Sequence, residues 1–447
     1  MTNPVTPTAA SPKKPGLFVM PDGRNRAVTF ALVSSLFLLW GFCNGMIDVM
    51  DKHFQEELHL TLAQSAWVQF AHYLGYFLMA LPAGWIATRL GYKGGIIFGL
   101  LLVALGGFWF IPATKIAMFW AFLLGVCLIA AGLTFLETVA NPYTTVLGPP
   151  EFAAARINLA QSCNGIGWIL GPIAGGMFFY GTDAAGKSTG SQTLWIPYVA
   201  VAVLVLVLVA VFKAADLPDV QSEDVYHLDD GRGEGKASIW THPHFVFAVV
   251  AQFAYVAAQS GIFSFFINYM TSQTPAIPAD WQTGVMAKWI QVGADGRAIL
   301  SNQGAAFLAS VGFFCFLAGR FSGAAILKKF SAPTVLGLYG LINVVACGLV
   351  ALKLGWLSVV CVFASYFFMS IMFPTIFALG IHGLGSRAKQ ASAFIVMAIM
   401  GGAIVPKLMG AVGDHYGMSI AFLVPLACFA VVMAYGFGWK RLSRQTA

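Results

Sequence analysis

The chain consists largely of apolar stretches, each long enough to cross a lipid bilayer. A membrane-spanning helix needs about 20 consecutive apolar residues, and twelve such stretches follow one another along the sequence. Hydrophobic residues make up 58% of the chain and charged residues only 10%, whereas soluble domains carry about 25% charged residues. We therefore expect an all-α integral membrane protein with twelve transmembrane helices. The expected spans are residues 27–50, 64–88, 94–113, 116–146, 153–181, 194–213, 244–271, 302–328, 333–352, 355–383, 389–413 and 418–438.

The longest polar segment separates the first six apolar stretches from the last six. Residues 214–242 are acidic and poor in apolar side chains, as expected of a flexible linker. A second polar insertion at 271–302 contains two tryptophans, and we expect a partly ordered external loop there. The sequence thus predicts two six-helix bundles. The predicted divisions are an N-terminal tail at 1–26, a first bundle at 27–213, the linker at 214–242, a second bundle at 243–438 and a C-terminal tail at 439–447.

The basic residues indicate how the chain is oriented. The formal net charge of +7 comes from 25 lysine and arginine residues, but these are scattered between apolar stretches, so nucleic acid is not an expected partner. Most of them fall in segments on the same side of the membrane as the N-terminus, and cytoplasmic loops carry such an excess. We therefore expect both termini to be cytoplasmic in a multi-pass protein of a bacterial inner membrane, surrounded by lipid.

Several classes of protein are disfavoured by the motifs of the sequence. The seven cysteines lie inside apolar stretches without a CxxC pair or Cys/His cluster, so no metal site is expected. No HExxH motif occurs, and the GxSxG match at residues 186–190 lies in an outer loop and not at a strand-to-helix turn, so we expect no catalytic residues and no enzyme. The GxxxxGK[ST] pattern of a primary pump is matched once, at residues 181–188, but this segment lies in an outer loop between two apolar stretches and not between a strand and a helix. Neither the charge rings nor the filter repeats of a channel occur.

Glu137 is the most informative single residue. It lies in the stretch FLETVANPY, and no other charged residue occurs between Lys115 and Glu151. A charged side chain at the centre of a membrane costs roughly 2.5–3.5 kcal/mol, and such acids usually line cavities or ion pathways. Because a carboxyl group removed from water favours its neutral form, Glu137 is a candidate proton carrier. Asn141, one helical turn later, shares its face. The alternative is a buried carboxyl group that only packs against a neighbouring helix.

Asp48 is a second candidate for proton coupling, near the end of the first apolar stretch. Trp40, Asn44 and Asp48 recur every four residues, so they share one face of a helix. We expect Trp40 and Asn44 to contact a substrate there. Asp51 follows closely. The alternative for both acids is that they are hydrated carboxylates at the end of a helix, with no part in coupling.

Amides and a tyrosine mark two further helix faces. Gln161 and Asn164 lie three residues apart in the fifth stretch, and Gln252, Tyr255 and Gln259 repeat this spacing in the seventh. Amides both donate and accept hydrogen bonds, which suits the hydroxyl groups of a sugar, so these residues are candidates for substrate binding. The alternative is hydrogen bonding between helices, worth about 0.6 kcal/mol a contact.

His72 and Lys407 are polar residues within apolar stretches. His72 is a candidate proton relay, or a satisfied polar residue inside a bundle. Lys407 either lines a cavity or extends its ammonium group toward the membrane surface.

The segment GWIATRLGYK resembles the loop signature of the major facilitator superfamily, G-x-x-x-D-R-x-G-x-basic. The match keeps Gly84, Arg89, Gly91 and Lys93, while Thr88 replaces the usual aspartate. The resemblance implies that this loop takes part in the conformational change of a transporter.

Six further segments resemble the fucose permease group, which includes glucose/galactose relatives. They occur in order along the chain and read LFLLWGFCNGMID, LETVANPYTTVLGP, RINLAQSCNGIG, AQFAYVAAQS, FPTIFALGI and SAFIVMAIMGGAIVP. The resemblance implies two six-helix bundles around a central sugar cavity and a monomeric protein. In the fucose permease, an aspartate on helix one and a glutamate on helix four take part in proton coupling. The matching positions here are Asp48 and Glu137.

The expected function is therefore the proton-coupled uptake of a monosaccharide, fucose or another hexose, by alternating access. Sodium-coupled relatives tend to have LQ where this chain has LE, at Leu136 and Glu137, which favours protons. No cofactor is expected apart from the coupling cation, H⁺ or alternatively Na⁺. Sodium-coupled glucose/galactose symport, an N-acetylglucosamine or fructose permease and a transporter-like sugar sensor stay open as alternatives.

Overall fold

The computed structural model covers the helical part of the chain. Most of the expected linker 214–242, most of the tail 1–26 and the last residues of the tail 439–447 lie outside the described residues. The described residues are 17–20, 23–149, 153–180, 193–215, 217, 238–293, 296–327, 329–384 and 388–444.

The described residues of the first part of the chain are mainly helical, as the apolar stretches predict. Its helices are α1 (Ala27–Glu57), α2 (Leu62–Ser65), α3 (Trp67–Ile116), α4 (Phe119–Val146), α5 (Ala153–Phe179) and α7 (Trp195–Ala214). We call these the first helix group.

The second part begins with the 3₁₀ turn η2 (Ile239–Thr241) and is also mainly helical. Its helices are α8 (Pro243–Ser264), α9 (Phe266–Ser272), α10 (Asn302–Leu327), α11 (Ala332–Ala351), α12 (Trp356–Met369), α13 (Met372–Ile381), α14 (Ala388–Met397), α15 (Gly401–Tyr416), α16 (Met418–Ala421) and α17 (Leu423–Arg444), with the 3₁₀ turn η6 (Ala398–Met400) between α14 and α15. These elements form the second helix group.

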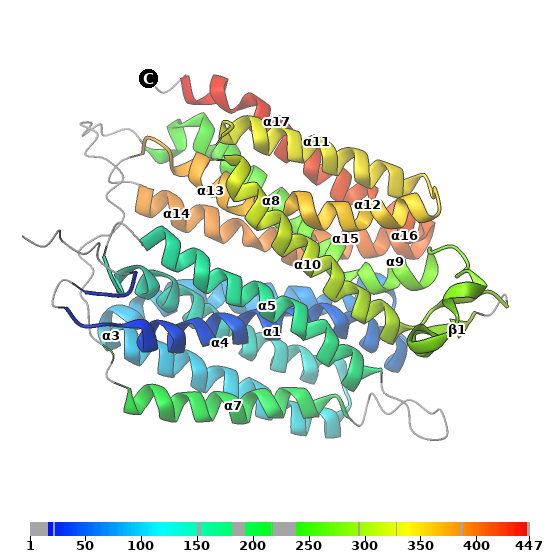
Figure 1. Cartoon of the computed structure of the whole chain (residues 1–447), viewed down its shortest axis with the longest axis horizontal. Helices are drawn as coiled ribbons and strands as arrows, with labels where there is room; N and C mark the ends of the chain where they lie inside the picture. The colour runs from blue at the N-terminus through cyan, green and yellow to red at the C-terminus, as the bar shows by residue number, and fades with distance from the viewer. Residues whose placement is uncertain are drawn as a thin grey trace, which may run out of the picture.

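The insertion expected as an external loop carries a small hairpin. It consists of the 3₁₀ turns η3 (Ala279–Trp281) and η4 (Gly284–Trp289), followed by the antiparallel strands β1 (Ile290–Val292) and β2 (Ala298–Leu300). Ile290 pairs with Leu300, and Val292 with Ala298. We call the end of the molecule that carries this hairpin the hairpin end. The opposite end, at which α1 begins and α17 ends, is the terminal end (Figure 1).

The expected count of twelve spans is not reproduced in full. Among the described residues, ten helices are long and apolar enough to cross a membrane. The expected spans without a counterpart in that set are 64–88 and 153–181, which carry polar residues such as Gln69 and Gln161 and are therefore less apolar. Both nevertheless form helices, within α3 and as α5.

The break between the second and third expected spans is reduced to a single residue. Helix α3 runs through both spans, and only Gly91, with φ 67° and ψ 179°, leaves the helical conformation. A positive φ of this kind is strained for residues with a Cβ atom. The backbone conformation therefore explains why the loop signature has a glycine at position 91.

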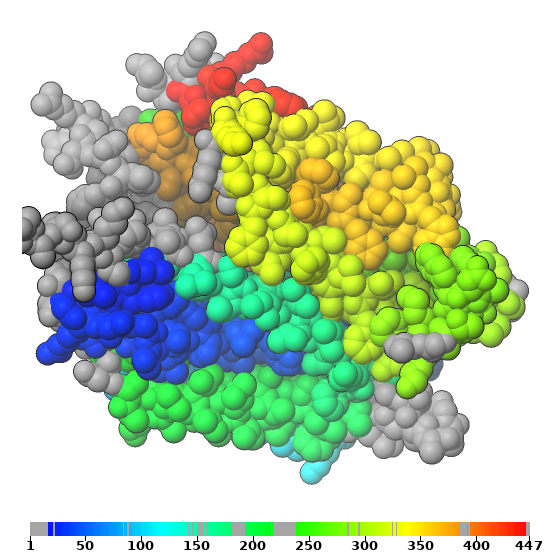
Figure 2. Space-filling model, in the orientation of Figure 1, coloured from blue at the N-terminus to red at the C-terminus, as the bar shows by residue number. Residues whose placement is uncertain are grey.

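The helices pack mainly within their own group (Figure 1). In the first group α3 packs against α4 and α7, and α1 packs against α5. In the second group α8 contacts α13, α15 and α17, and α11 contacts α12 and α17. The groups meet where α5 lies along α10, which Figure 2 shows across the middle of the visible face, and where α15 contacts α2 and α3.

Glycines permit the close approach of α1 and α5. A Cβ atom at Gly167 would lie 2.2 Å from the carbonyl oxygen of Leu38, and one at Gly41 would lie 2.0 Å from that of Asn164. Small residues allow helix backbones to approach in this way in membrane proteins. This contact fixes the face of α1 that carries Asn44 and Asp48.

Large apolar side chains cover the outward faces of several helices. Leu204 and Val207 on α7, Leu338 on α11 and Val360 on α12 are each about half exposed or more. Exposed apolar surface of this extent would be a liability in water. It fits contact with lipid.

Candidate functional site

The polar face of α1 points into the seam between the two helix groups. Trp40 Nε1 donates a hydrogen bond to the hydroxyl group of Tyr76 on α3. One and two turns further along α1, Asn44 and Asp48 are both buried. The four-residue spacing of Trp40, Asn44 and Asp48 thus places these residues along the inner side of the first helix group.

Asp48 is held by Gln69 of α3. The Gln69 Nε2 atom donates to Asp48 Oδ1 at 2.9 Å and also lies 3.5 Å from Asp51 Oδ2. On the other side, the Ser260 hydroxyl of α8 donates to Gln69 Oε1 at 3.5 Å. This polar cluster therefore joins three helices and both helix groups.

A small cavity lies beside this cluster. Its volume is about 50 Å³, which offers room for water molecules rather than for a sugar. Both helix groups line it: Asn44, Ile47, Asp48, Gln69, His72, Tyr73, Trp168, Gln259, Ser260 and Phe263. Admitting a larger ligand requires the two groups to move apart.

Glu137 lies on α4, on the terminal side of this cluster. Its side chain is half-buried and lies in the vicinity of Tyr76 and Tyr73. Asn141, one turn later, donates through Nδ2 to the backbone carbonyl of Glu137 at 3.1 Å, and Gln161 of α5 donates to Asn141 Oδ1 at 3.1 Å. Polar groups from α3, α4 and α5 therefore gather around the Glu137 region.

The remaining amide candidates lie in different surroundings. Asn164 Nδ2 donates to the carbonyl oxygen of Phe37 at 3.3 Å, which is a contact between α5 and α1. Gln252 is fully buried, and neither polar atom of its side chain has a hydrogen-bond partner among the described residues. Tyr255 is buried and lies near Arg320 of α10. Gln259 lines the cavity.

His72 and Lys407 differ in their positions. His72 is buried, lines the cavity, and its ring lies 5.0 Å from the ring of Tyr76. The Lys407 ammonium group instead lies 4.1 Å from the centre of the Trp67 ring, at the contact between α15 and α3, and its side chain is exposed. Lys407 is thus placed away from the residues that line the cavity.

The loop signature lies at the terminal end of the first helix group. Lys93 Nζ donates to the carbonyl oxygens of Lys213 and Ala215 at 2.9 and 2.8 Å, where α7 ends. A cation at this position donates to free carbonyl groups, and it interacts favourably with the negative end of the helix dipole. The Arg89 guanidinium group lies 4.2 Å from the centre of the Trp85 ring. Gly84 lies within α3.

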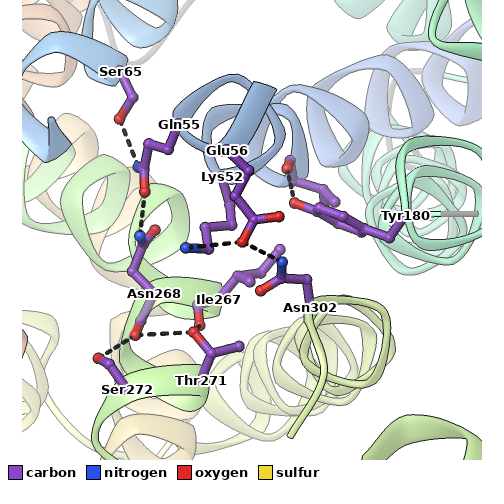
Figure 3. Close-up of polar contacts among 11 residues, drawn as sticks. Lys52, Gln55, Glu56, Ser65, Tyr180, Ile267, Asn268, Thr271, Ser272 and Asn302 are labelled. Atoms are coloured by element: carbon purple, nitrogen blue, oxygen red, sulfur yellow. Dashed lines mark hydrogen bonds and ion pairs between the residues drawn. The ribbon is translucent and has the colours of Figure 1, made fainter. Parts of the chain in front are cut away.

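Hydrogen bonds join the two groups at the hairpin end, as Figure 3 shows. Gln55 of α1 donates to the Ser65 hydroxyl at 2.7 Å and accepts from Asn268 of α9. Beside them, Asn302 at the start of α10 donates to Glu56 at 2.6 Å. Glu56 also lies 3.3 Å from the Lys52 ammonium group.

Asp414 of α15 makes a further contact between the groups. Its two carboxylate oxygens accept from the backbone N–H groups of Leu62 and Ala63 at 2.8 and 3.0 Å. The carboxylate therefore satisfies two donors at the start of α2, where a helix leaves its N–H groups without partners. Together with the contacts of Gln55 and Glu56, it closes the hairpin end.

Sequence reasoning did not select Gln69, Tyr76, Ser260 or Asp414 as functional residues. Gln69 and Tyr76 lie in the same stretch as His72, and their helical spacing could have indicated a shared face. The partners of Ser260 and Asp414 come from the other helix group, and no local pattern reveals them.

The chain matches the Major Facilitator Superfamily over residues 29–406. It belongs to this superfamily. Its helices and their grouping are those of a transporter family and not of an enzyme family.

The relatives of this superfamily member include two named sugar transporters. The L-fucose-proton symporter of Escherichia coli strain K12 is 35% identical over 450 residues, covering 95% of each chain. The glucose/galactose transporter of Brucella abortus biovar 1 strain 9-941 is 34% identical over 411 residues, covering 91% of this chain and 93% of the relative.

A solved structure supports the same assignment to the superfamily. The transporter FucP in the outward conformation is 34% identical, with a TM-score of 0.64, over 92% of this chain and 99% of the other. The resemblance to the fucose permease group is thereby confirmed, as is the helical membrane fold.

Proposed function

We propose that this protein is a secondary active transporter that couples the uptake of a monosaccharide to the inward movement of protons. The observation that carries the proposal is the pair of carboxyl groups: Asp48 lies at the seam between the helix groups, and Glu137 lies among polar side chains of the first group. They lie in a chain that is 35% identical to an L-fucose-proton symporter over 95% of its length. Intramembrane acids that face a bundle interior are typical of proton pathways.

The residues around the two acids have distinct roles in this proposal. Trp40, Asn44, Asn141 and Gln161 supply the aromatic ring and the amide groups that hydrogen-bond sugar hydroxyls. Asp48 and Glu137 take up protons while the site faces outward and release them inward. Because the protonated acids are neutral, the loaded site can be removed from water at a lower cost.

Gln259 on α8 and Tyr255 one turn earlier supply the second helix group's contacts to the sugar. Gln252 and Asn164 are further candidates, although the hydrogen bond from Asn164 to Phe37 also supports a packing role. His72, which lines the cavity, is a candidate relay between Asp48 and the solvent. Closure of the seam around these groups is the alternating-access step.

The membrane orientation is part of the proposal. The hairpin end faces the outside of a bacterial inner membrane, and both termini are cytoplasmic, because the basic residues gather toward the terminal end. The chain acts as a monomer with bundles at 27–213 and 243–438. The segment 84–93, which carries Arg89 and Lys93, moves with the first bundle.

The test is uptake into proteoliposomes of labelled L-fucose, D-glucose, D-galactose, D-fructose and N-acetylglucosamine. Each sugar is offered first under an inward proton gradient and then under an inward sodium gradient. Accumulation of one sugar under the proton gradient supports the proposal and identifies the substrate. Accumulation only under the sodium gradient would replace protons with Na⁺, and binding without transport would indicate a sugar sensor.

A further inference from the structure

Asp51 is a buried acid to which the mechanism above gives no role. It lies on α1 one turn after Asp48, and its side chain is 0% exposed. The Oδ1 atom of Asp51 and the Oδ2 atom of Asp48 are buried without hydrogen-bond partners among the described residues. An acid in such a position is costly unless it is paired, hydrogen-bonded or protonated.

The two carboxyl groups share one donor. Gln69 Nε2 lies 2.9 Å from Asp48 Oδ1 and 3.5 Å from Asp51 Oδ2. The Ser264 hydroxyl of α8 lies beside Asp51, and the Ser260 hydroxyl contacts the other end of the Gln69 amide. Asp48 and Asp51 therefore lie in one buried cluster between α1, α3 and α8.

In the part of the chain that the structure describes, neither acid forms an ion pair. Lys52, the basic residue that follows Asp51 on α1, instead pairs with Glu56. Among the described residues, the titratable groups near the acids on neighbouring elements are phenols and one imidazole. They are Tyr73 of α3 and Tyr366 of α12 in the vicinity of Asp48, Tyr180 after α5 and Tyr198 of α7 in the vicinity of Asp51, and His72 of α3 at the cavity.

Two carboxyl groups this close in a buried site disfavour the state in which both carry a charge. Like charges in a shared buried site force one of the two groups to keep its proton. The proton comes from solvent water, forms an O–H bond to one carboxylate oxygen, and leaves the pair with a single negative charge. Gln69 can then donate to the acid that remains ionised.

We propose that Asp48 and Asp51 form a proton-sharing pair, and that the hairpin end closes only after this pair has taken up a proton. The inference rests on the proposed function and extends it to a second carboxyl group on α1. Ser260 and Ser264 belong to the second helix group, whereas Asp48, Asp51 and Gln69 belong to the first. Separation of α8 from α1 would admit water, in which both acids can ionise.

The pair thereby links protonation to the movement of the helix groups. In the open state the hydrated acids exchange protons with the outside. In the closed state the pair is buried and accommodates only one negative charge. Closure at alkaline pH is therefore unfavourable in the wild-type protein, and it becomes favourable when Asp51 is replaced by a neutral side chain of the same shape.

Equilibrium exchange of sugar across proteoliposomes tests this requirement, because exchange needs opening and closing but no gradient. The sugar is the one that the wild-type protein transports from the panel above, at equal pH on both sides. We expect wild-type exchange to fall as the pH rises. Asp51→Asn should retain exchange up to a pH at least about one unit higher than the wild type does. The reason is that two strongly interacting carboxyl groups shift each other's pKa by more than about one unit.

Two variants serve as controls. Asp51→Glu keeps the second acid and should follow the wild-type pH profile. Asp280→Asn removes an exposed acid from the external insertion and should also leave the profile unchanged. Because Glu137 is present in all of these proteins, its own contribution to the pH dependence is the same throughout.

A wild-type pH profile in Asp51→Asn would overturn the inference, and so would a loss of exchange in a variant that still binds sugar. Should Asp51→Asn fail to fold, infrared spectra of Glu137→Gln and of the double variant Glu137→Gln/Asp48→Asn decide, because Glu137 then contributes no band. A shared proton predicts a protonated-carboxyl band at neutral pH in Glu137→Gln that the double variant lacks, and its presence in both would contradict the pair. Absence of any sugar exchange by the wild type would instead refute the proposed function.

Discussion

At the scale of single residues, the two acids of the proposed mechanism have different surroundings. Asp48 is buried and accepts a hydrogen bond from Gln69. Glu137 is half-buried and faces Tyr76, which is joined to Trp40. The protonation of Asp48 thus depends on the packing of α1 against α3. The protonation of Glu137 depends instead on the aromatic and amide groups of the proposed sugar site.

Glu137→Gln is expected to abolish accumulation of sugar against a gradient while sugar exchange continues. Glutamine has the shape and the neutral charge of the protonated acid, but it cannot release a proton to drive net transport. Uptake and exchange of the same labelled sugar in proteoliposomes measure the two activities. If the variant concentrates sugar as well as the wild type does, Glu137 is not a coupling residue.

Asp48→Asn is expected to weaken the pH dependence of sugar uptake. In the wild type, uptake should rise as the external pH falls, because more of the outward-facing carboxyl groups are protonated when they meet the sugar. Asparagine at this position is neutral at every pH, so the rise should become shallower. Initial uptake rates across a pH series, with Asp280→Asn as the control, measure the effect, and an unchanged profile would count against the role of Asp48.

At the scale of helices, the closed hairpin end depends on a few polar contacts between the groups. Gln55 and Asn268 are 213 residues apart in the sequence and hydrogen-bond to each other. Asp414 reaches the start of α2 from α15. Since hydrogen bonds to charged groups contribute about 1.5–3 kcal/mol when buried, and less when exposed, loss of one contact should shift the balance between open and closed forms without unfolding the protein.

Asp414→Ala is expected to open the hairpin end more often. The backbone N–H groups of Leu62 and Ala63 would then donate hydrogen bonds to water instead of to the carboxylate. A cysteine introduced at Ser260, which is buried in the seam, should react faster with a membrane-impermeant thiol reagent in this variant. Asp280→Ala is the matched control. Equal labelling rates in both would show that Asp414 does not hold the hairpin end closed.

Gly167→Ala is expected to lower the stability of the first helix group. The added methyl group would lie 2.2 Å from the carbonyl oxygen of Leu38, and overpacking of this kind costs about 1–3 kcal/mol. Gly438→Ala on α17 is the control, because nothing lies within 4 Å of its added methyl group. Thermal unfolding in detergent measures both, and an equal melting temperature would contradict the close packing of α1 on α5.

At the scale of the whole molecule, the sequence was sufficient for the fold because membrane spans are local patterns. Apolar stretches predict their own helices, and an isolated acid such as Glu137 is visible in one dimension. The pairing of Gln69 with Asp51, and of Gln55 with Asn268, depends on how distant helices pack. Such contacts leave no periodic pattern, so the hairpin-end network and the burial of Asp51 beside Gln69 emerged only from the structure.

The measurement that tests the central claim most directly is the movement of protons with sugar. Proteoliposomes that contain the protein and an internal pH indicator are given the transported sugar from outside, with no ion gradient. Proton-coupled symport predicts that the interior becomes acidic as sugar enters, and that Glu137→Gln abolishes this acidification. Sugar entry without any change of internal pH would contradict the account.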